Sequence, residues 1–330
     1  MTDPGDYTYD RLDYCLTDLQ ITYTEYSEAE PGEVLGTGVL TVDSSATLSA
    51  TTGQWQESET VTLTSVSGEV EDLEVGLTAS CNSTCAPTTP SPWSGTELLA
   101  EGESASGAVT FQATPGAGNV SYVTTSYNLT VLQPGTTPIN ASSTWTNPQA
   151  VRCDTLFPYA TQTSTGCVIA AVRPQITLSL ATYGAAAALY GFAEQDWIDE
   201  WGTNGSPLQR QPNPAIQTAN RTNTCGTGAS RPFVINDSVV PDDSCDEYPF
   251  AATYQGGKDG GLCADVFPLL ENGTWMLYED PNAPAVTYNE PCLRGHVPSS
   301  ENSLVGPALG NFAKSQRVID GDNYNVVVTS

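Results

Sequence analysis

Two short stretches in the last third of the chain combine residue types suited to hydrolytic chemistry. The first, residues 245–251, reads CDEYPFA and places the adjacent carboxylates Asp246 and Glu247 directly after a cysteine. The second, residues 294–302, reads RGHVPSSEN and contains His296, the only histidine of the protein, and Asn302. A carboxylate can accept a proton from water, and an oxygen ligand near a helix start can hold a hard cation. We interpret the two stretches as the halves of a single-metal site for phosphodiester hydrolysis.

Local sequence signals predict the elements that position these residues. Pro249 fixes a turn between two aromatic rings that anchor the first stretch in a core. Strands are expected over residues 262–268 and 275–278, joined by a tight turn at Asn272-Gly273. Ser299 or Ser300 is expected to cap the start of a helix, which should kink or restart at Pro307. Residues 324–328 read as a closing strand.

The rest of the chain divides into regions of different composition. A β-rich, sandwich-like accessory domain is predicted over residues 1–150, because apolar residues there alternate with Ser and Thr at a period of two. Residues 151–205 predict a bridging strand and helix, the helix over 183–201. Residues 206–330 form the domain with the candidate site, and 206–244 read as loop-rich. Arg221, within that loop-rich part, is a candidate to face phosphate or an ordinary surface cation.

Cysteines and glycosylation signals predict a secreted protein. The chain has nine cysteines and no C-x-x-C pair, and its single histidine cannot complete the usual zinc sets. Disulfides are therefore expected, with one thiol left over. Eight N-x-S/T sequons begin at Asn82, Asn119, Asn128, Asn140, Asn204, Asn220, Asn236 and Asn272.

The charge of the protein limits how it can meet a polyanion. The formal net charge is −28, with only ten Lys and Arg residues. Such an acidic coat favours solubility and argues against a scaffold that grips DNA through a basic face. A nucleic-acid enzyme of this composition would need a metal ion to offset phosphate charge. No run of eighteen apolar residues is present, so no membrane-spanning helix is expected.

A set of motifs in the C-terminal quarter carries a family resemblance. CDEYPFA at 245–251 is followed by Gly256-Gly257, CADV at 263–266, HVPSSENS at 296–303 and RVIDGD at 317–322. In this order the motifs resemble the NucA/NucB family of secreted deoxyribonucleases, over about residues 240–328. The resemblance implies a ββα-metal nuclease core and an α+β fold overall, with the β-sandwich-like domain in front. It also implies a divalent cation, Mg²⁺ or Mn²⁺, and DNA cleavage with little sequence specificity.

The resemblance also implies roles for individual residues. Asp246 matches the carboxylate that replaces histidine as the base, and Asn302 matches the metal ligand. Glu247 is a second catalytic candidate. The family's D-N dipeptide is Glu301-Asn302 here, which makes Glu301 a further metal candidate. Two cations of this region, Arg294 and Arg317, are expected to contact phosphate.

Other interpretations compete with this one. His296 within Arg294-Gly295-His296 resembles the base of another ββα-metal nuclease group, although too few residues separate it from Asn302 for an intervening strand. A non-catalytic secreted β-sandwich adhesion or binding protein with a degenerate nuclease domain is the main alternative function. A glycosidase is disfavoured because Asp246 and Glu247 would point to opposite faces of a strand. A monomer acting on DNA is the expected state.

Overall fold

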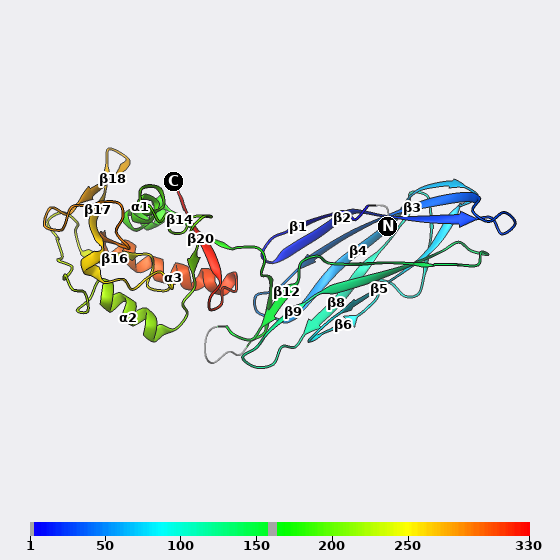
Figure 1. Cartoon of the computed structure of the whole chain (residues 1–330), viewed down its shortest axis with the longest axis horizontal. Coiled ribbons are helices and arrows are strands. Elements are labelled where there is room, and N and C mark those ends of the chain that lie inside the picture. Colours follow the sequence, from blue (N-terminus) through cyan, green and yellow to red (C-terminus); the bar gives the residue numbers. More distant parts are fainter. Residues whose placement is uncertain (1–2, 158–163) are drawn as a thin grey trace. The chain divides into compact units, whose positions relative to one another are not determined.

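The computed structural model describes residues 3–157 and 164–330, which form two compact units (Figure 1). The first unit is Met1–Val172 and the second is Arg173–Ser330. The segment 151–205, predicted as a bridge, is divided between them. Its first strands pair within the first unit, and its later strand and helix pack within the second.

The first unit is built from strands. They are β1 (Asp6–Tyr9), β2 (Asp13–Tyr26), β3 (Val34–Thr47), β4 (Gln54–Gly68), β5 (Asp72–Cys81), β6 (Cys85–Thr89), β7 (Glu97–Ala100), β8 (Ser104–Ala113), β9 (Val120–Val123), β10 (Thr125–Leu132), β11 (Ser142–Thr146), β12 (Val151–Asp154) and β13 (Gly166–Ile169). They form sheets in the orders β1-β2-β3-β4-β8-β6, β11-β10-β5-β7 and β13-β12-β9. The predicted strand-rich character of this region is confirmed.

Apolar side chains from the two larger sheets share one core. Leu40 and Val61 of the first sheet and Leu73 and Leu129 of the second belong to the same buried cluster. Buried and more exposed positions alternate along β3, β4, β5 and β10, as expected of strands with one face in a core.

Two glutamates lie among these apolar residues, on the inward face of β4. Glu57 is 0% exposed and accepts hydrogen bonds from the hydroxyls of Tyr14 and Tyr127 and, at 3.0 Å, from Trp55 Nε1. Glu59 is 1% exposed, and neither of its carboxylate oxygens has a hydrogen-bond partner among the described residues. Burial raises the pKa of both carboxyls, that of Glu59 well above its usual range.

The second unit combines helices with two sheets. Its elements are β14 (Gln175–Ser179), α1 (Leu180–Asp196), β15 (Leu208–Gln209), α2 (Pro214–Thr224), β16 (Asp243–Tyr248), the 3₁₀ turn η1 (Gly260–Leu262), β17 (Ala264–Glu271), β18 (Thr274–Glu279), β19 (Leu293–Pro298), α3 (Ser299–Ser315) and β20 (Asn323–Thr329). One sheet has the order β16-β19-β17-β18 and the other β14-β20-β15. The described residues are thus β-rich with three α-helices, in agreement with an α+β fold.

The elements around the candidate site form two antiparallel strands and a helix. β16 pairs antiparallel with β19, and α3 begins directly after β19 ends. Helix α1 packs against both strands and against α3. Asn302 in the first turn of α3 is thereby brought to β16, more than fifty residues earlier in the chain.

Several predicted elements differ in extent. Helix α1 covers Leu180–Asp196 and stops before Trp197, which takes an extended conformation and is buried. Helix α3 continues through Pro307 without interruption. The loop-rich interpretation of residues 206–244 was wrong for α2, because Pro214 starts that helix and Asn213 caps it through a 3.0 Å bond to the Ala215 amide.

The expected disulfides are present. They join Cys81 to Cys85, Cys153 to Cys167, Cys225 to Cys245 and Cys263 to Cys292, and Cys15 is a free, exposed cysteine. Within the part of the chain that the structure describes, no helix has the length and apolarity needed to cross a membrane.

Candidate active site

Strand β16 separates the two adjacent carboxylates. It lies at the edge of its sheet with β19 as its neighbour, and successive side chains on a strand point to opposite faces. Asp246 turns toward α1, whereas Glu247 turns toward α2. The pair therefore cannot act as one two-carboxylate group, which agrees with the argument made against a glycosidase.

Asp246 is enclosed. It is 5% exposed, and the hydroxyl of Tyr190 on α1 donates to its Oδ2 over 2.5 Å. Burial raises the pKa of Asp246 to about 8, and the charge of Glu247 adds to this rise. Its raised pKa favours the protonated form of Asp246, and its carboxyl group contacts a protein side chain.

Glu247 is the more accessible carboxylate. Its side chain is 13% exposed, and its Oε1 lies 4.0 Å from Nε of Arg221, a side chain that is 55% exposed. Burial raises the pKa of Glu247 to about 7, although Arg221 opposes this rise. A carboxylate with a pKa near neutrality and a cation beside it is suited to accept a proton from water next to an anion.

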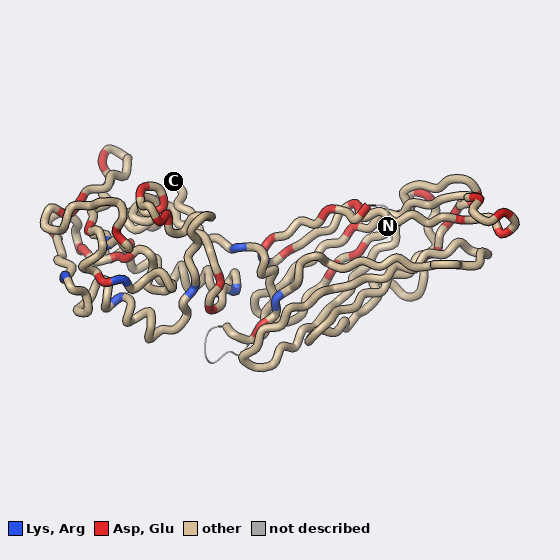
Figure 2. The backbone as a smooth tube through the Cα atoms, in the orientation of Figure 1, with Lys and Arg blue, Asp and Glu red and all other residues tan. Residues whose placement is uncertain are grey.

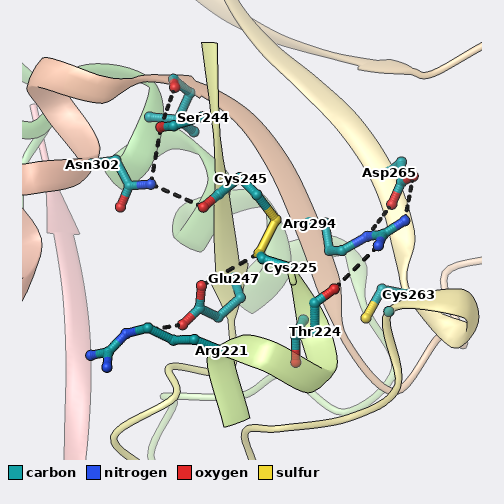
Figure 3. Close-up of a disulfide and its surroundings, with 12 residues drawn as sticks. Arg221, Thr224, Cys225, Ser244, Cys245, Glu247, Cys263, Asp265, Arg294 and Asn302 are labelled. Atoms are coloured by element: carbon teal, nitrogen blue, oxygen red, sulfur yellow. Dashed lines mark hydrogen bonds and ion pairs between the residues drawn. A yellow bond between two sulfur atoms is a disulfide. The ribbon is translucent and has the colours of Figure 1, made fainter. Parts of the chain in front are cut away.

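Asn302 is fixed at the edge of β16 by its own amide group. Its Nδ2 donates to the Cys245 carbonyl oxygen over 3.0 Å and to the Ser244 hydroxyl over 3.1 Å (Figure 3). Both donor positions of the amide are thus used by the protein. Its Oδ1 has no hydrogen-bond partner among the described residues and is left as an oxygen donor that points away from β16.

Glu301, the other predicted metal candidate, contacts α1. Its Oε2 accepts from the backbone amide of Ala185 over 2.5 Å. This amide follows Gly184, whose φ of 47° and ψ of −124° interrupt the helix, so the carboxylate caps the restarted helix. A side chain at position 184 would collide with the Glu301 carboxylate, which accounts for glycine there.

Arg294 lies inside the unit. It is 0% exposed, and its Nε and Nη2 donate to the two carboxylate oxygens of Asp265, each over 2.7 Å. Its Nη1 donates to the carbonyl oxygens of Thr224 and Arg231 over 3.2 and 2.9 Å. The predicted phosphate contact would require Arg294 to leave this ion pair, which joins β17, β19 and the end of α2.

His296 is also buried, at 1% exposure. Its ring lies between Phe267 and Phe233, with centroid distances of 3.9 and 4.3 Å, and its Nδ1 is 2.7 Å from Asp243 Oδ2. Its Nε2 is 3.8 Å from a carboxylate oxygen of Asp280. The structure therefore places His296 in a core position next to Cys245, and does not bring it to Asn302.

Arg317, the second predicted phosphate contact, is 1% exposed. Its backbone φ is 45°, at the turn that follows α3. Both predicted phosphate-binding arginines are therefore enclosed by protein, and Arg221 is the cation that the structure places at an accessible carboxylate.

Sequence reasoning gave too little weight to two partners of the site. Arg221 was weighed as a surface cation, and the signal that places it is the helix start at Asn213-Pro214, which puts residue 221 in the last turn of α2. Asp265 was treated only as part of a strand. Its pairing with Arg294 depends on the parallel alignment of β17 with β19, which no local signal specifies.

The donor set at β16 fits a hard cation with few protein ligands. Asn302 offers its amide Oδ1 at the edge of β16. Within residues 3–157 and 164–330, no group of three or more His, Cys, Asp or Glu side chains is arranged to hold a metal. Proteins often coordinate Mg²⁺ through one or two oxygen ligands, with water and substrate phosphate as the remaining ligands. Zinc sites need more protein ligands.

Cationic residues are concentrated in the second unit. Eight of the ten Lys and Arg residues belong to it, the other two being Arg11 and Arg152 (Figure 2). Of the two units, the second is thus the better equipped to contact a polyanion.

Comparison with known proteins shows a family similarity within the second unit. A search of curated protein sequences returned no match to this chain. A family model described as Deoxyribonuclease NucA/NucB matches residues 198–274, a segment that contains Arg221, Asp246 and Glu247 and ends before Asn302. Residues 198–274, in the C-terminal part of the chain, are therefore similar to the NucA/NucB deoxyribonuclease family.

Proposed function

We propose that the protein is a secreted, metal-dependent endonuclease that hydrolyses DNA phosphodiester bonds with little sequence preference. One observation carries the proposal beyond the family match. Asn302 is hydrogen-bonded to the carbonyl oxygen of Cys245, and Glu247 lies two residues further along β16. Two residues of a strand span about 7 Å, a distance that one phosphate group and an attacking water can bridge.

Glu247 acts as the proton acceptor in this proposal. It takes a proton from a water molecule, whose oxygen forms a bond to phosphorus as the bond to the leaving oxygen breaks. Asp246 held this role in the sequence-based prediction. Its 2.5 Å bond to Tyr190 and its 5% exposure favour a different role, that of fixing β16 against α1.

Asn302 would hold the cation through Oδ1, with water completing the coordination. When bound, a Mg²⁺ or Mn²⁺ ion supplies stabilisation of the charge that develops on the phosphate and on the leaving oxygen. The hydrogen bonds from Asn302 Nδ2 to β16 fix the orientation of the amide, so that its oxygen is held in place before the substrate arrives.

Arg221 contacts the substrate phosphate. Its exposed guanidinium pairs with Glu247 through Nε at 4.0 Å and can also donate to a phosphate oxygen. A phosphate contact provides affinity without reading bases, which fits cleavage with little sequence preference.

The disulfides and the acidic composition fit an extracellular protein, and the β-rich first unit serves as an accessory domain. The test is a plasmid-nicking assay of the full chain with Mg²⁺ or Mn²⁺ and with EDTA. Nicking that requires the metal and is lost in Glu247→Gln supports the proposal. Full activity in chelator would remove the metal mechanism, and a folded chain that never nicks DNA would favour the non-catalytic binding protein.

A further inference from the structure

The Cys225–Cys245 disulfide lies at the centre of the proposed site (Figure 3). Cys245 precedes Asp246 on β16, and its carbonyl oxygen accepts the hydrogen bond from Asn302. Cys225 ends α2, and its sulfur lies 3.6 Å from Oε2 of Glu247. The bond therefore joins the helix that carries Arg221 to the strand that carries Glu247.

Helix α2 has little else to hold it against the unit. Of its eleven residues only Thr224 is buried, and its apolar Ile216 is 41% exposed. Helix α1, in contrast, buries nine of its seventeen residues. Isolated helices of this length are marginal in water, and most helices are stabilised by packing an apolar face that α2 does not have.

The remaining attachments of α2 are polar. Asn220 Nδ2 donates to the Ala251 carbonyl over 2.9 Å, and Thr224 Oγ1 donates to the Lys258 carbonyl over 2.7 Å. The carbonyl of Thr224 also accepts from Arg294. These bonds lie in the second half of the helix, and water competes for those near the surface.

We propose that the Cys225–Cys245 disulfide is a positioning element of the site, which holds α2 in its place and Arg221 beside Glu247. Without the bond, α2 separates from β16 while the β16-β19-β17-β18 sheet remains. The claim about α2 stands on the structure alone, whereas the consequence for catalysis rests on the proposed nuclease function.

Hydrogen–deuterium exchange of the full chain tests the structural part. In the Cys225→Ser/Cys245→Ser variant, amides of residues 217–224 should exchange at least about tenfold faster, because this helix opens locally. In the same variant, the exchange rates of the β19 amides should change less than threefold. In the control variant Cys81→Ser/Cys85→Ser, the exchange rates of all amides of the second unit should change less than threefold. The proposal would be overturned if the amides of α2 kept their protection from exchange, or if the amides of β19 lost as much protection as those of α2.

The catalytic part is tested by a cycle of variants in the nicking assay. Arg221→Ala, the Cys225→Ser/Cys245→Ser variant and the triple variant that combines them should have the same kcat/KM within about threefold, each with a raised KM. A disulfide with a merely structural role would instead give losses that multiply in the triple variant, which would overturn the positioning role. If the unmodified chain cleaves no DNA, the nuclease function fails, whereas the exchange experiment still decides whether the bond holds α2.

Discussion

Nδ2 of Asn302 donates to the main-chain carbonyl of Cys245 over 3.0 Å, and this bond ties the first turn of α3 to the edge of β16. An asparagine used in this way has its amide nitrogen committed and its oxygen available. The neighbouring Glu301 faces α1 instead, where it caps the Ala185 amide. Two adjacent polar residues thus have different tasks.

This division predicts different outcomes for two neighbouring substitutions. Asn302→Ala should raise the metal concentration for half-maximal nicking at least about tenfold, as losses around metal ligands do. Glu301→Ala should leave that concentration unchanged and lower the free energy of unfolding by about 1–2 kcal/mol, the usual cost of losing a helix cap. Metal titrations of nicking and urea unfolding measure the two effects. A metal requirement raised equally by both substitutions would instead support Glu301 as a ligand.

The pH dependence of cleavage should report the ionisation of Glu247. Because its carboxyl has a pKa of about 7 and must be ionised to accept a proton, kcat/KM should rise about tenfold per pH unit below that value and then level off. The measurement is kcat/KM between pH 5 and 9 at saturating metal. Glu247→Gln should lose about 10²–10⁴-fold and should no longer show this rise. If Asp246→Asn lowered kcat/KM more than Glu247→Gln does, Asp246 and not Glu247 would be the base.

Asp246 should make the second unit less stable as pH rises. The folded protein keeps the Asp246 proton up to a pKa of about 8, whereas the unfolded chain releases it near 4. The folded state therefore binds more protons between these values, and the free energy of unfolding falls as pH rises through this window. In Asp246→Asn this contribution is absent, so the variant should gain stability relative to the unmodified protein between pH 5 and 8. Urea unfolding at several pH values measures the difference, and a constant difference would contradict the assignment.

Replacing each of the two buried glutamates of the first unit by leucine should have different effects on the stability of that unit. Glu57→Leu leaves the hydroxyls of Tyr14 and Tyr127 and the indole of Trp55 without their acceptor. Each unsatisfied buried donor should lower the free energy of unfolding by about 1–3 kcal/mol. Glu59→Leu removes a buried carboxyl without hydrogen-bond partners among the described residues, so it should leave the first unit equally stable or more stable. Thermal unfolding of the two variants compares them at pH 7. Equal destabilisation would show that Glu59 has a partner of similar importance.

The predictions that succeeded rest on short-range signals. Asn272-Gly273 adopts positive φ at both residues and joins β17 to β18, as an Asn-Gly turn should. Helix α3 starts at Ser299, as expected to within one residue, although its N-cap is Pro298 and no side chain caps it. Alternation of apolar residues with Ser and Thr predicted the strand-rich character of the first unit, which includes β2, β3 and β4.

The predictions that differ from the structure involve partners distant in sequence. Arg294 was expected at phosphate because an arginine near a nuclease motif is a reasonable clamp. Its burial depends on Asp265, which reaches it only through the pairing of β17 with β19. Helix α2 was missed because Pro214 was interpreted as a loop residue, although it occupies the first turn of a helix. Asp246, Glu247 and Asn302 were proposed as site residues from the sequence, but their separate surroundings were not predicted.

The most direct test of the account is the position of a manganese ion in crystals of the Glu247→Gln variant soaked with Mn²⁺. The account predicts anomalous density about 2.1 Å from Oδ1 of Asn302, at the edge of β16. An ion held elsewhere in the second unit, with Asn302 outside its coordination sphere, would contradict the proposed site.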